Sequence, residues 1–151
     1  MNVTDRTPIQ VVAIVPLSLE AGGDELLVFQ REDLLVLPHG TARHRERLLD
    51  AAVRVVSEQA GFSPVPARIV YLLESNDGSV AIGAVCTLPS NLNDETDLHG
   101  EFVSLTQSDL PLVPMALREV LVEDLRSGFV RPVAHLVEGD SPDGLAVTVT
   151  W

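Results

Sequence analysis

The run from Gly40 to Phe62 constrains the fold of this chain more than any other stretch. A glycine opens it, Glu46 follows after five residues, Arg54 follows after seven more, and Gly61 stands next to its end. Apolar residues recur at helical spacing over 47–60. A glycine commonly ends a helix because it adopts a left-handed backbone at little cost. The run therefore predicts a loop, a helix over 47–60 and a tight exit at the glycine.

Five short runs rich in apolar and β-branched residues are expected to form strands. These runs are 8–15, 25–31, 68–74, 79–88 and 101–105. The turn signal Asn76-Asp77-Gly78 predicts that the third and fourth runs form a β-hairpin. Turn residues at 21–24 predict that the first two runs also lie as a hairpin-like pair.

A second helix is predicted near the C-terminal end. Ser108-Asp109 is a candidate N-cap, Gly128 is a candidate end, and an apolar stripe lies between them. The stripe consists of Leu117, Val120, Leu121 and Leu125. The proline-rich segment 63–66 is expected to be a rigid connector, and the polar, acidic segment 89–100 a loop.

Length and composition predict one domain with its own core. The chain has 151 residues, of which 46% are hydrophobic, and this fraction argues against disorder. No apolar run is long enough for a membrane span, and the first residues lack the pattern of a signal peptide. Cys86 is the single cysteine, so no internal disulfide forms, and a reducing, cytoplasmic setting is expected.

Charge limits the partners of the chain. The formal net charge of −12 opposes binding to nucleic acid or to an anionic membrane, because phosphate groups would be repelled at long range. All ten basic side chains are arginines. Any phosphate contact must therefore come from arginine, histidine or backbone N–H groups.

The run Gly40–Phe62 resembles the Nudix box, whose pattern is Gly, five residues, Glu, seven residues, then Arg-Glu-U-x-Glu-Glu-x-Gly-U, with U a bulky apolar residue. Seven positions match by type, namely Gly40, Glu46, Arg54, Val56, Glu58, Gly61 and Phe62. Val55 and Gln59 stand where the pattern has glutamates. The resemblance extends from about Ile9 to about Leu125. It implies an α+β fold, an α-β-α sandwich in which helices flank a mixed central β-sheet.

In active members of this family, glutamates at the positions of Val55, Glu58 and Gln59 hold Mg²⁺ ions that bridge a diphosphate. The resemblance thus implies Glu58 as the catalytic residue. It implies a metal site formed by Glu58, the Gly40 carbonyl, Gln59 and a relocated carboxylate, with Glu101 the first choice. Mg²⁺ prefers clustered, charged oxygen ligands, whereas valine offers none and glutamine offers only a neutral one. Mg²⁺ is therefore expected only if the protein is hydrolytic.

A helical wheel predicts which side of the box helix faces the core. It groups Val55, Glu58 and Gln59 on the metal-facing side. The predicted core face consists of Leu49, Ala52, Val53, Val56 and Ala60. On this prediction the two departures from the pattern fall at the centre of the ligand face.

Arginines gather at the start of the predicted helix, where four of the ten lie between Arg43 and Arg54. One interpretation is a metal-free anion site at a helix N-terminus. The other is an exposed loop that balances nearby acids. The candidate substrate-binding residues are Arg31, His39, Arg43, Arg45 and Arg54. Arg54 is also expected to pair with Glu46 or Glu58 as a structural bridge.

The tail beyond the family pattern has strand character at 145–151. We expect a Nudix-like domain over 1–128 and a C-terminal extension over 129–151. The extension is either a last strand of the same domain or an arm that contacts a partner subunit in a homodimer.

Three functions fit the sequence. The first is a module with a degenerate metal site, without hydrolysis or weakly active, that binds a phosphorylated or nucleotide-like ligand or a protein partner. The second is a Mg²⁺-dependent hydrolase of a nucleoside diphosphate linked to another moiety, which uses Glu58 and a relocated carboxylate. The third is a structural or protein-interaction domain.

Overall fold

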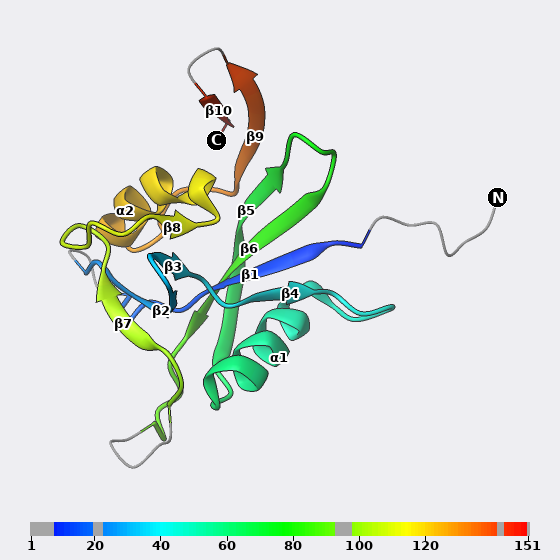
Figure 1. The fold of residues 1–151 in the computed structure, drawn as a ribbon. Helices are drawn as coiled ribbons and strands as arrows, with labels where there is room; N and C mark the ends of the chain where they lie inside the picture. The colour runs from blue at the N-terminus through cyan, green and yellow to red at the C-terminus, as the bar shows by residue number, and fades with distance from the viewer. Residues whose placement is uncertain (1–7, 20–22, 93–97, 142–143, 151) are drawn as a thin grey trace.

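The structure is a computed structural model that describes residues 8–19, 23–92, 98–141 and 144–150. Its described part contains two β-sheets and two α-helices (Figure 1). The fold is of the mixed α+β type that the box pattern implied. None of the helices in these ranges is both long and apolar enough to cross a membrane.

The larger sheet has six strands and is mixed. Its spatial order is β10 (Gly144–Thr150), β9 (Ala134–Ser141), β5 (Val65–Glu74), β6 (Val80–Thr87), β1 (Gln10–Ile14) and β4 (His39–Thr41). β1 runs parallel to β6 and β5 runs parallel to β9, while the other neighbours are antiparallel. The predicted β5–β6 hairpin is confirmed. β5 begins earlier than expected, because Val65 and Pro66 pair with β6 instead of forming a separate connector.

The smaller sheet has four strands. Its order is β7 (Glu101–Ser104), β2 (Glu25–Arg31), β3 (Leu34–Val36) and β8 (Leu112–Val113). The predicted pairing of the first two strands is wrong in its main part, since β1 joins the larger sheet and β2 the smaller one. A bridge between Pro16 and Leu26 and flanking backbone hydrogen bonds join the two segments after β1 ends.

Side-chain alternation on the central strands separates two cores. On β1, Val11 and Ala13 pack toward helix α1 (Leu48–Ala60), and Val12 and Ile14 pack toward the other core. The first core also contains Ala52, Val56 and Ala60 of the helix. Helix α1 covers one face of the larger sheet, as Figure 1 shows. It begins one residue after the predicted start, and it ends as predicted at Gly61, whose φ is 87°.

Helix α2 (Arg118–Ser127) begins later than expected, after a short 3₁₀ helix at Met115–Leu117. The Ser108-Asp109 N-cap prediction is therefore wrong. Pro111 and Pro114 lie in the intervening segment, and proline lacks the N–H that a helix interior needs. That segment instead contains β8.

A buried polar group ties α2 to the larger sheet. The Tyr71 hydroxyl donates to Asp124 Oδ2 at 2.6 Å, and Arg131 Nε donates to Asp124 Oδ1 at 2.9 Å. Burial and the neighbouring carboxylate raise the pKa of Tyr71. Because β9 starts just after Arg131, this group also fixes where the C-terminal hairpin joins the sheet.

Candidate functional site

The segment that leads from β4 into α1 contains Arg43, Arg45 and Arg47, three of the four arginines of the box. The Arg43 carbonyl accepts from the Glu46 N–H at 3.0 Å, so His44 and Arg45 are the two central residues of the turn. Arg45 has φ of 64°, in the left-handed region where glycine or asparagine is usual. Among the described residues, neither Arg45 nor Arg47 forms an ion pair.

Arg54 joins three parts of the box. Its Nε and Nη2 donate to the two carboxylate oxygens of Glu46 at 2.9 and 3.0 Å, and Nη2 also donates to the Thr41 carbonyl at 2.8 Å. The hydrogen bonds from Arg54, with help from the Arg43 backbone N–H, lower the pKa of Glu46 to about 2. The predicted structural bridge is therefore present, and it fixes the turn to the helix and to β4.

Glu58, the candidate catalytic residue, is exposed and ion-paired. Its carboxylate accepts from Arg43 Nη2 at 3.3 Å and from Arg54 Nη1 at 3.4 Å. Its side chain remains 54% exposed, so each pair is weak on its own. The two contacts nevertheless compete with any cation that would approach the carboxylate.

Both polar atoms of the Gln59 side chain form hydrogen bonds with the backbone of His39. Its Nε2 donates to the His39 carbonyl at 2.6 Å, and its Oε1 accepts from the His39 N–H at 3.3 Å. A neutral amide can do both, whereas a carboxylate could only accept. Gln59 therefore fastens the end of α1 to β4. His39 was expected in a turn, but it lies in β4 without a positive φ, so glycine is not needed there.

Val55 is buried, which corrects the helical-wheel prediction. It is 1% exposed, and an added Cβ at Gly40 would lie only 2.8 Å from Val55 Cγ2. Gly40 is thus needed for the close approach of β4 to α1. Ala51 is also fully buried, whereas the predicted core residues Leu49 and Val53 are half-buried. The wheel failed because β4 covers a side of the helix that was expected to face ligand.

The other two candidate residues stand apart from this network. Arg31 is exposed at the end of β2 and Glu101 is exposed at the start of β7, both in the smaller sheet. In the described ranges, no three side chains of His, Cys, Asp or Glu gather closely enough to hold a metal ion. Glu101 is thus not brought into a cluster with Glu46 and Glu58.

The groups present do not fit Mg²⁺. Val55 has no donor atom, the Gln59 oxygen already accepts an N–H, and Glu58 faces two guanidinium groups. Mg²⁺ demands several hard, preferably anionic oxygens in octahedral geometry. The donor chemistry of the box side chains therefore opposes a magnesium site there.

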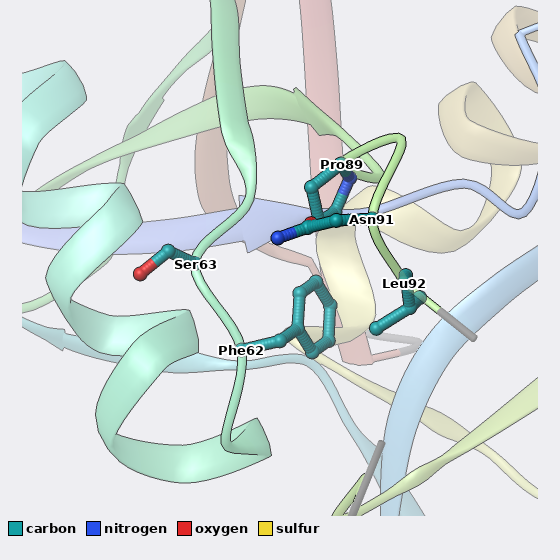
Figure 2. A pocket seen from close by; sticks show the side chains of 5 residues that line it. All are labelled: Phe62, Ser63, Pro89, Asn91 and Leu92. Carbon is teal, nitrogen blue, oxygen red and sulfur yellow. The ribbon is translucent and has the colours of Figure 1, made fainter. Parts of the chain in front are cut away.

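A small pocket of about 300 Å³ lies at the opposite end of α1. Phe62, Ser63, Pro89, Asn91 and Leu92 line it (Figure 2). A helix of 13 residues is roughly 20 Å long, so this pocket is far from the arginines of the turn. None of the predicted site residues lines it.

The sequence did not predict the two contacts that occupy the Gln59 amide and bury Val55. The Gln59–His39 pair and the Val55–Gly40 contact both depend on β4, which the sequence pattern did not show as a strand. The Asp124 carboxylate was also missed. Its place between Leu121 and Leu125, on the apolar side of α2, was a usable signal of a buried polar partner.

No protein-family model matches this sequence, and no curated protein matches it. Solved structures do share the fold. A NUDIX hydrolase from Nitrosomonas europaea is 14% identical, with a TM-score of 0.64, and the match covers 85% of this chain and 76% of that one. An ADP-ribose pyrophosphatase from Streptococcus suis is 21% identical, with a TM-score of 0.63 and coverage of 87% and 99%. A MutT protein from Bacillus halodurans is 15% identical, with a TM-score of 0.64 and coverage of 94% and 97%.

Proposed function

We propose that this chain, which has the Nudix fold, binds a phosphorylated or nucleotide-like ligand at the turn before α1 and hydrolyses it weakly or not at all. The observation that carries the proposal is Arg45. An arginine with φ of 64° costs about 1 kcal/mol relative to glycine, and no ion pair within the described residues offsets that cost. Backbone strain of this kind is commonly retained where it serves a function.

Local charge supports an anionic ligand. The run Gly40–Phe62 carries four arginines against three carboxylates, whereas the rest of the chain has six arginines and nineteen carboxylates. The first N–H groups of α1 have no partner within the helix, and they add a partial positive charge at the same end. Arginine suits phosphate because its planar group donates two parallel hydrogen bonds.

The box side chains do not favour efficient metal-dependent hydrolysis. Val55 and Gln59 serve the packing of β4 on α1, and Glu58 alone of the three positions keeps a carboxylate. The alternative is hydrolysis of a nucleoside diphosphate linked to another moiety, through Glu58 and a relocated carboxylate such as Glu101. The solved hydrolases with this fold are what favours that alternative.

The test of the proposal is binding of ADP-ribose and ATP in the presence of EDTA, measured by calorimetry. We expect saturable binding, and we expect Arg45→Gly to raise the Kd about tenfold or more, because a charge-assisted hydrogen bond is lost. The same variant should be as stable as the native chain or slightly more stable, since glycine suits the backbone. Arg126→Ala, which removes an exposed arginine from the end of α2, is the matched control and should leave the Kd unchanged.

Absence of binding without metal, or equal binding by the Arg45→Gly variant, would count against the anion site. Hydrolysis is checked in parallel with nucleotide sugars, dinucleotides and nucleoside triphosphates in Mg²⁺ and Mn²⁺. Turnover that Glu58→Gln abolishes would establish the hydrolase alternative instead.

A cytoplasmic setting remains part of the proposal. Cys86 is buried, and burial raises the pKa of its thiol to about 11, so it stays protonated and unreactive. The other partner expected from the sequence is a second copy of this chain, in a homodimer.

A further inference from the structure

Strand β10 is an unprotected edge of the larger sheet. It pairs with β9 over seven consecutive residues without a register shift, and no strand of the described residues lies on its other side. Exposed edges are normally protected by charged residues, proline, a bulge or a very short strand. β10 has none of these, since Gly144–Thr150 contains neither charge nor proline. β4, at the opposite edge, has only three residues.

The apolar side chains on one face of the sheet also become exposed at this edge. Leu136 of β9 is fully buried, and Val149 stands directly opposite it on β10, so both side chains point to the same face. Val149 nevertheless remains 36% exposed, because nothing in the described part of the chain continues the sheet beyond β10. The apolar layer that begins in the core therefore ends at an exposed valine.

Figure 1 shows the β9–β10 hairpin rising from the rest of the sheet. Only the first half of β9, from Ala134 to Val137, pairs with β5. In the part of the chain that the structure describes, the second half pairs with β10 alone. Among the described residues, no strand pairs with the outer edge of β10.

We propose that β10 pairs antiparallel with β10 of a second copy of this chain, which joins the two larger sheets across a two-fold axis. Charge limits where a second copy can approach. Each copy carries a net charge of −12, so two copies repel over most of their surfaces. An uncharged strand paired with itself sets no like charges opposite each other, whereas β9, with Glu138 and Asp140, would do so. The exposed Val149 of each copy gains an apolar neighbour.

The resulting dimer is weak and concentration-dependent, with a Kd in the micromolar range, because one strand pair makes a small interface. The dimer does not depend on the proposed ligand site, since the turn before α1 follows β4, at the other edge of the sheet.

Sedimentation equilibrium of the full chain over a series of concentrations tests the proposal. We expect the mass to rise from that of one chain to that of two. Val149→Lys should raise the Kd about tenfold or more, because it sets like charges close together at the new junction. Thr148→Lys places the charge on the other face of β10 and should have the same effect. Val130→Lys is the matched control, since Val130 is 76% exposed outside any strand, and it should leave the Kd unchanged.

Far-UV circular dichroism of each variant verifies its fold. Thr148 is exposed, so Thr148→Lys gives a folded variant even where Val149→Lys does not. A chain that stays monomeric at every concentration would overturn the proposal. A dimer that both β10 lysine variants leave intact would overturn it as well.

Discussion

Replacing Val55 by glutamate, the residue that the Nudix box has at this position, is expected to lower the free energy of unfolding by about 3–5 kcal/mol. Val55 is 1% exposed and lies against Gly40, so a longer, charged side chain would be buried without space. Arg54, the adjacent cation, already donates to Glu46 and to the Thr41 carbonyl. An unpaired buried carboxylate is among the most destabilising single changes. Urea unfolding followed by circular dichroism measures the loss.

Val53→Glu is the matched control for this prediction. Val53 is on the same helix and is half-buried, so the same substitution there should cost much less. If Val55→Glu is as stable as Val53→Glu, Val55 does not serve the packing that we assign to it. Unfolding is repeated with millimolar Mg²⁺. Full recovery of stability by the metal would show instead that the box retains a site for it.

Gln59→Glu is expected to lower the free energy of unfolding by about 1–2 kcal/mol at pH 7. The Nε2 donor to the His39 carbonyl is lost, and a carboxylate oxygen would face that carbonyl at the present 2.6 Å. The pair is exposed, so water limits the cost. This is again a change toward the family pattern that weakens the fold.

The pH dependence distinguishes this mechanism from a general effect of added charge. In the Gln59→Glu variant only the protonated carboxyl can donate a hydrogen bond to the His39 carbonyl, so the pKa of the new carboxyl is raised in the folded state. Its stabilising contribution is present below the pKa of the unfolded chain and is lost as pH rises through the folded pKa. The difference from the native chain should therefore shrink on acidification. Gln107→Glu, at an exposed turn residue, is the control and should show no such trend.

Much of the fold could be predicted because its signals are local. The Asp77-Gly78 turn sets the β5–β6 hairpin, and Gly61 ends α1. The order of strands around the box matched a known pattern. The pairing of Arg54 with Glu46 could also be predicted, since both residues belong to that pattern.

The errors come from contacts between segments distant in sequence. β4 is only three residues long, and it is held by β1 and by Gln59, so no local pattern marks it as a strand. Because the sequence did not predict β4, it predicted that Val55 faces the ligand. The start of α2 was misplaced because β8 forms by pairing with β3, which periodicity cannot show.

These contacts explain what Val55 and Gln59 do at the two positions where the sequence differs from the box pattern. Val55 and Gln59 do more than depart from the box pattern, since each contributes to the contact between β4 and α1. The arginines of the turn remain as the cationic groups at this end of α1. The proposed binding of an anionic ligand can therefore be tested separately from metal binding.

Calorimetric titration of the native chain with Mg²⁺ in the absence of nucleotide tests directly whether the box side chains hold a metal ion. Val55 and Gln59 contact β4, and Glu58 pairs with two arginines. We therefore expect no saturable binding at millimolar Mg²⁺, and no difference between the native chain and Glu58→Gln. Saturable binding that Glu58→Gln abolishes would show instead that the box holds Mg²⁺ through Glu58.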